Sequence, residues 1–151
     1  MTIRHPYDRA TFGLAYDHPA NPAPGTDFVH VLPLMSRIEL VAVYFTLATD
    51  ANVANRLAMV RYVNGIIPNL PFWGPRFQIN GTTIEYVFCN GMTREPGIAP
   101  VAGFYQNCLG TDVIVDNVTS FEIHIDGMQV GDQISNIYFW YKFWFTGQPP
   151  V

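Results

Sequence analysis

His124 and Asp126 are the residues whose types and spacing come nearest to a chemical site. They stand two positions apart in residues 119–126, where apolar and polar side chains alternate, so both share the polar face of one strand. Such a pair can supply half of an acid–base couple or two metal ligands. A metal site needs three or four convergent ligands. The remaining histidines lie in or near the N-terminal segment: His5, His18 and His30. We therefore expect His124 and Asp126 to be structural.

The sequence contains no other recognisable group of catalytic residues. The chain holds 12 acidic residues, and no motif pairs two of them. Several aspartates fall near predicted turns, where Asp hydrogen-bonds the local backbone: Asp50, Asp112, Asp126 and Asp132. Such acidic turns could bind Ca²⁺ between strands, although no EF-hand spacing is present. No Gly-x-Ser-x-Gly motif surrounds a serine. The sequence thus predicts a non-enzymatic protein with no catalytic residue, no cofactor and no metal.

The composition of the chain argues against several further classes of protein. Charged residues make up 13% of the 151, about half of the ~25% usual in soluble domains, whereas apolar residues reach 49% and aromatic residues 15%. With a net charge of −4 and no basic run, nucleic-acid binding is not expected. No run of 18 apolar residues predicts a membrane span, and the N-terminus does not resemble a signal peptide. Cys89 and Cys108 lack metal-ligand spacing and are expected to be reduced thiols.

The pattern along the chain predicts an all-β protein. Residues 1–27 contain scattered prolines and single apolar residues, which predicts an extended Pro-rich N-terminal arm. Residues 28–151 contain short alternating or apolar runs separated by Gly, Pro and Asn turns. The strongest runs are 38–47, 57–63, 82–88, 119–126 and 134–145, with 68–75 a loop or weak edge strand. We expect an antiparallel, jelly-roll-like β-sandwich with Greek-key connections.

Residues 134–145 are unusual because both faces of this predicted strand are aromatic or apolar. The chain itself, for instance the arm, could cover the second face. A partner subunit could cover it instead, as exposed aromatic patches often imply, or the rings could stack on sugars. Arginine outnumbers lysine seven to one, as at many interfaces. The predicted interface residues come from the arm and this strand: Arg4, Tyr7, Arg9, Phe12, Tyr16, Tyr138, Trp140 and Trp144.

Two segments resemble known proteins. Residues 36–56 include the run Thr-Asp-Ala-Asn-Val-Ala-Asn-Arg, and residues 130–137 read Val-Gly-Asp-Gln-Ile-Ser-Asn-Ile. Both resemble segments of small β proteins that tailed bacteriophages encode among their virion structural genes. The resemblance implies a virion component with a jelly-roll-like fold, assembled in the cytoplasm of a host bacterium. It brings no catalytic residue.

The expected function is therefore structural. We expect a capsid decoration (cement) or minor head protein that binds the major capsid protein or other virion subunits through the arm and the sandwich. A homo-oligomer is expected, and the resemblance suggests a trimer. The alternative is a carbohydrate-binding or receptor-binding module of a phage tail or fibre, with Trp73, Trp140, Trp144 and tyrosines as stacking platforms.

Overall fold

Ten β-strands make up the secondary structure of the part of the chain that the structure describes. The computed structural model describes residues 13–32, 37–64, 67–90, 103–109, 115–116 and 118–144. Its strands are β1 (Gly13–Asp17), β2 (Phe28–Val31), β3 (Arg37–Ala48), β4 (Leu57–Asn64), β5 (Ile67–Trp73), β6 (Thr83–Cys89), β7 (Phe104–Cys108), β8 (Val115–Asp116), β9 (Ser120–Asp126) and β10 (Gln133–Trp144). None of these residues forms a helix, so no helix long and apolar enough to cross a membrane occurs among them.

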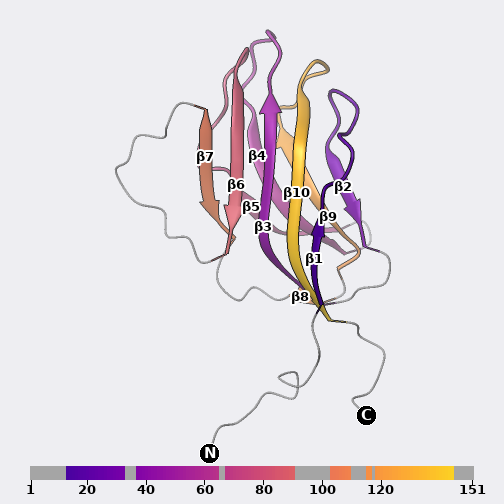
Figure 1. The fold of residues 1–151 in the computed structure, drawn as a ribbon. Coiled ribbons are helices and arrows are strands. Elements are labelled where there is room, and N and C mark those ends of the chain that lie inside the picture. The colour runs from indigo at the N-terminus through magenta and orange to yellow at the C-terminus, as the bar shows by residue number, and fades with distance from the viewer. Residues whose placement is uncertain are drawn as a thin grey trace, which may run out of the picture.

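The strands form two facing sheets (Figure 1). The six-stranded sheet has the order β1-β10-β3-β6-β7, and β8 pairs with the first two residues of β3. The four-stranded sheet has the order β2-β9-β4-β5. All pairings are antiparallel except that of β6 with β7. The predicted all-β antiparallel sandwich is therefore confirmed. The predicted weak edge at residues 68–75 is β5, which lies at the margin of the four-stranded sheet, where proline is tolerated.

Aromatic rings fill the space between the sheets. Phe45 of β3 stacks on Tyr86 of β6 with ring centroids 5.0 Å apart. Phe139 of β10 lies 5.8 Å from Phe121 of β9, across the interface between the sheets. All four side chains are fully buried. This core explains the strong alternation of β9 and β10, because every second residue of each strand must face the opposite sheet.

The described part of the predicted arm belongs to the sandwich. Residues Gly13–Asp17 form β1, which pairs with β10 at the edge of the six-stranded sheet. Gly13 lies against the ring of Phe143, where a Cβ atom would come within 2.1 Å of a ring carbon. Asp17 fixes the other end of β1, since its carboxylate accepts a 3.0 Å hydrogen bond from Tyr141 and lies 3.1 Å from His30 of β2.

For residues 13–17 this placement differs from the irregular, extended arm that the sequence analysis predicts over residues 1–27. Single apolar residues between polar ones are typical of an edge strand as well as of an irregular segment, and pairing with β10 decides between the two. The loop after β1 is also attached, because Gln133 donates a hydrogen bond to the carbonyl of Pro22. Residues 1–12 lie outside the described part of the chain.

A buried ion pair joins the β3–β4 and β9–β10 connections, which lie at the upper end of the sandwich in Figure 1. The side chains of Arg56 and Asp132 are both fully buried. The five N–H groups of the guanidinium all find acceptors: two on Asp132 at 2.9 Å each, one on Asp50 at 2.6 Å, and the carbonyls of Asn52 and Ala54 at 2.8 and 2.6 Å. The β3–β4 loop and the β9–β10 loop are therefore joined through one side chain.

The carboxylates of this pair also organise the backbone around them. Asp132 accepts N–H groups from Asp50 and Gln129 at 2.9 and 2.8 Å, and Asp50 accepts one from Gly131 at 3.2 Å. Gly127 allows the close approach of the two loops, since its φ is +78° and a Cβ there would lie 2.3 Å from the carbonyl oxygen of Asn55. The predicted turn role of Asp50 and Asp132 is confirmed.

Removing Arg56 should destabilise the protein far more than removing another arginine of the same strand region. Arg56→Ala leaves Asp132 buried without its cation, and we expect a loss of about 3–5 kcal/mol in the free energy of unfolding. Arg61→Ala is the matched control, because its ion pair with Glu122 is partly exposed and should contribute about 1 kcal/mol or less. Urea unfolding measures both values. Equal losses in the two variants would contradict the role assigned to Arg56.

Acid should weaken the same network. Burial raises the pKa of Asp132, but the hydrogen bonds from Arg56 and from two backbone N–H groups outweigh it, so the pKa lies below its ordinary value of 3.8. Stability from ionised Asp132 is then present above about pH 4 and lost as the pH falls through the folded-state pKa. A carboxyl carbon NMR titration should place the midpoint of Asp132 below 3.8. A midpoint at or above 3.8 would contradict this account.

Candidate functional site

A cluster of aromatic rings lies on the outer side of the six-stranded sheet, which no described strand covers (Figure 1). We call it the outer aromatic face and define it by Tyr16 of β1, Tyr44 of β3, and Tyr138 and Trp140 of β10, with His18 beside them. Tyr16 is 55% exposed, and the other three rings of the cluster are partly exposed. The face therefore presents apolar surface that the described residues leave open to contact.

The rings of the outer aromatic face lie against one another. Tyr138 and Trp140 are near parallel, with an interplanar angle of 18° and centroids 6.0 Å apart. Tyr16 lies 5.2 Å from Trp140, and His18 stacks on Tyr138 at 4.2 Å and 6°. The His18 ring is held in addition by a 2.8 Å hydrogen bond between its Nδ1 and the carbonyl oxygen of Ile137. The rings of this face are thus held in one arrangement by their contacts with one another and by the hydrogen bond of His18.

The alternation of β10 places these rings outside. Its residues Ile137, Phe139 and Tyr141 face the core, so Tyr138 and Trp140 face outward. Asn136 has a φ of +50° at a register shift between β10 and β3, and this irregularity sets the alternation that follows. The rings border a shallow hollow of about 390 Å³, whose other lining residues are Ala42, Val43 and Val87.

Three predicted interface residues meet on this face: Tyr16, Tyr138 and Trp140. Trp144 is in β10, but the structure does not describe its side chain. The other four predicted interface residues lie wholly outside the described part of the chain: Arg4, Tyr7, Arg9 and Phe12. The sequence analysis missed Tyr44 and His18. The pairing of Tyr44 with Tyr138 in the register of β3 and β10 explains the first omission, because no local pattern reveals which strands pair.

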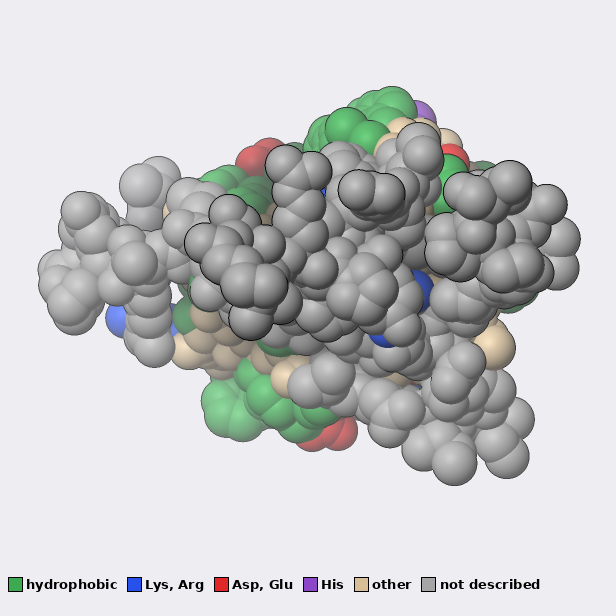
Figure 2. All heavy atoms as spheres, turned by 90° about the horizontal axis from the view of Figure 1, so that it is seen from below, with side chains coloured by type: hydrophobic (Ala, Val, Ile, Leu, Met, Phe, Trp, Pro, Cys, Tyr) green, Lys and Arg blue, Asp and Glu red, His purple; other side chains and the backbone are tan. Residues whose placement is uncertain are grey.

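Apolar side chains of the described residues also stand out in space-filling view. Figure 2 shows them in two groups, at the top and at the lower left of this view from below. Trp73 does not extend the outer aromatic face, because it belongs to β5 in the other sheet. Trp73 and Trp140, two of the predicted stacking residues, therefore lie in different sheets.

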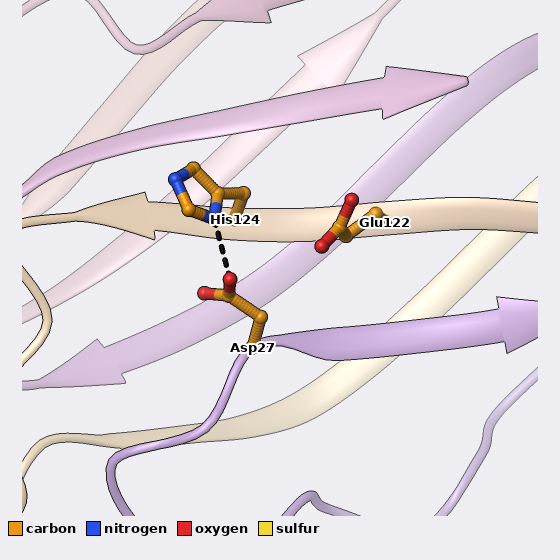
Figure 3. A group of neighbouring side chains, drawn as sticks. All are labelled: Asp27, Glu122 and His124. Carbon is orange, nitrogen blue, oxygen red and sulfur yellow. Dashed lines mark hydrogen bonds and ion pairs between the residues drawn. The ribbon is translucent and has the colours of Figure 1, made fainter. Parts of the chain in front are cut away.

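The His124 region forms a different group from the one predicted. His124 Nδ1 contacts the carboxylate of Asp27, just before β2, and Glu122 lies beside them on β9 (Figure 3). Asp126 shares the outward face of β9 but is not among the residues that approach one another here. Asp27 escaped the sequence analysis because it is 97 residues from His124 along the chain.

Cys89 and Cys108 are brought together by the fold. They are partners in the parallel register of β6 and β7, and neither forms a disulfide. Burial, together with the neighbouring Cys108, raises the pKa of the Cys89 thiol. A raised thiol pKa lowers the fraction of reactive thiolate at neutral pH, which fits a packing role for Cys89.

Comparisons of the chain with protein-family models, with curated proteins and with solved structures found no match.

The outward residues of β10 should contribute less to the free energy of unfolding than its inward, core-facing residues. Phe139→Ala should cost about 3–5 kcal/mol of unfolding free energy, because the ring is fully buried. Trp140→Ser, one position along β10, should cost about 1 kcal/mol, the loss of contacts with Tyr16 and Tyr138. Urea unfolding of the isolated protein compares them. A loss for Trp140→Ser as large as for Phe139→Ala would mean that the chain itself covers this face.

Proposed function

We propose that this chain is a non-enzymatic structural protein of a bacteriophage virion, a capsid decoration (cement) or minor head protein. In this proposal the outer aromatic face is the surface that binds neighbouring subunits, either further copies of this chain or the major capsid protein. The observation that carries the proposal is the array of Tyr16, Tyr44, Tyr138 and Trp140 on a sheet face that no described strand covers.

The chemistry of the face supports protein contact. Large aromatic side chains are enriched in the centres of protein interfaces, where their area gives binding energy at small cost in conformational entropy. The low content of charged residues, 13%, supports the same conclusion, because a charge-poor surface is poorly suited to full exposure in water. In an assembly, neighbouring subunits would remove such surface from solvent.

The winding of the sandwich supports a jelly-roll assignment. Without β7 and β8, the two sheets read β1-β10-β3-β6 and β2-β9-β4-β5. The chain passes from one sheet to the other after β1, β2, β3 and β5, and again before and after β9. Jelly rolls are eight strands wound as two Greek keys, and both viral capsid and lectin domains use them. This support is a likeness of architecture and does not by itself assign a function.

The two segments that resemble bacteriophage proteins have a structural role in common. Asp50 and Arg56 belong to the first, Asp132 belongs to the second, and they meet in the buried ion pair that joins two loops. The resemblance therefore concerns residues that stabilise the fold. Residues that stabilise a fold are those that proteins of one fold would share, and this supports the proposal.

Assembly gives the proposed mechanism. Each contact made only in the assembled particle stabilises that state by mass action, and symmetry multiplies the contacts. We propose a homo-oligomer, with a trimer as the first expectation, located in the virion. The N-terminal residues 1–12 are a second proposed contact, so a deletion that ends before Gly13 removes them and leaves β1 in place.

Association should depend on the outer aromatic face. In sedimentation experiments the native chain should self-associate or bind undecorated particles, and the Tyr16→Ser/Trp140→Ser double variant should bind about 10–100-fold more weakly. Val53→Ser is the matched control, because Val53 is 93% exposed in the β3–β4 loop and lies away from the face. A native chain that stays monomeric at high concentration and does not bind particles would contradict the proposal.

A second candidate function is binding of carbohydrate receptors. The near-parallel rings of Tyr138 and Trp140 beside a shallow hollow favour it, since sugars stack on such surfaces. Glycan-array binding that Trp140→Ser abolishes, without any self-association of the native chain, would favour this alternative over the structural role.

A further inference from the structure

Three potential metal ligands converge on the outer side of the four-stranded sheet. They are Asp27, in the segment that leads into β2, and Glu122 and His124 of β9 (Figure 3). One donor atom from each residue lies within 4.8 Å of the other two, and all three side chains are partly buried. This group is separate from the outer aromatic face, which belongs to the other sheet.

The fold holds each carboxylate in place through a contact outside the group. Asp27 accepts a 3.0 Å hydrogen bond from the backbone N–H of Ile125 through Oδ1, while Oδ2 faces His124. Glu122 accepts a 2.6 Å hydrogen bond from Arg61 through Oε2, which leaves its other oxygen for a further partner. Glu122 and His124 stand two residues apart on one strand and so share its outward face. Ligands fixed in this way lose little entropy when an ion binds.

We propose that Asp27, Glu122 and His124 form a binding site for a divalent transition-metal ion of the Zn²⁺ class. One imidazole nitrogen and two carboxylate oxygens suit such an ion, whereas Ca²⁺ takes six to eight oxygen ligands and Mg²⁺ keeps octahedral oxygen coordination. Three protein ligands and a water complete a four-coordinate site. Tetrahedral coordination at ~2.1 Å needs donor atoms about 3.4 Å apart. Side-chain rotations must therefore bring the more distant donors together and separate His124 Nδ1 from Asp27 Oδ2, which are in direct contact without the ion.

The charges around the three ligands determine how tightly the site should bind a metal ion. Two carboxylates attract the ion, and Arg61 beside Glu122 offsets one of these negative charges. The site is therefore expected to bind more weakly than structural zinc centres with four protein ligands. Binding would tie the segment before β2 to β9, so the ion should also stabilise the sandwich. This proposal does not depend on the virion role.

Titration of the purified full chain with Zn²⁺ by calorimetry, and with Co²⁺ by visible absorption, tests the site. We expect saturable binding of one ion per chain, a raised melting temperature with Zn²⁺, and Co²⁺ absorption bands typical of four-coordination. His124→Ala and Asp27→Asn should each weaken binding at least tenfold. Asp126→Asn is the matched control, because Asp126 shares the outward face of β9 and should leave binding unchanged.

His5 and His18 are further potential ligands along the chain, so the His5→Ala/His18→Ala double variant tests whether an ion binds elsewhere. Its affinity should equal that of the native chain. Circular dichroism establishes that each variant is folded, and Glu122→Gln, which keeps the shape of the side chain, is a further ligand variant if His124→Ala does not fold. Absence of saturable binding, or binding unaffected by the His124 and Asp27 variants, would overturn the proposal.

Discussion

The fully buried guanidinium of Arg56 is the interaction on which the upper end of the sandwich depends. Its five hydrogen bonds use every donor that the side chain has, and Asp132 receives two of them. A buried cation without such partners would cost several kcal/mol, so the loops that supply the acceptors must take up one arrangement. The backbone of Arg56 also exchanges hydrogen bonds with Gln78, which brings the β5–β6 connection to the same point. Three connections of the sandwich are fixed together in this way.

Strand β10 contributes side chains to both faces of the six-stranded sheet. Its inward residues Phe139 and Tyr141 complete the core, and its outward residues Tyr138 and Trp140 form the outer aromatic face. The network at Asp132 lies immediately before this strand, so the position of the outward rings follows from the same loop that Arg56 fixes. A rigid sheet carrying an apolar array suits a protein that binds neighbours through a preformed surface, since little order must be gained on association.

Most of the architecture could be predicted from local pattern. The alternation in residues 119–126 correctly gives β9 and its inward face, the run 134–145 correctly gives β10, and the Gly and Asn turns separate the strands. Contacts between distant segments could not be predicted. The role of Arg56 depends on Asp132, 76 residues away, and the partner of His124 is Asp27, which no spacing reveals. For β1, the prolines after it favour an irregular arm, and only pairing with β10 shows that residues 13–17 extend the sheet.

Hydroxyl-radical footprinting of Tyr16, Tyr138 and Trp140 tests the central claim most directly. Labelling of the isolated chain is compared with labelling of the same chain assembled with its partner subunits, and mass spectrometry measures oxidation at each residue. The account predicts that these three side chains become protected on assembly, while Val29 and Val31 on the edge strand of the other sheet react to the same extent in both states. Unchanged oxidation of the three aromatic residues in the assembled particle would contradict it.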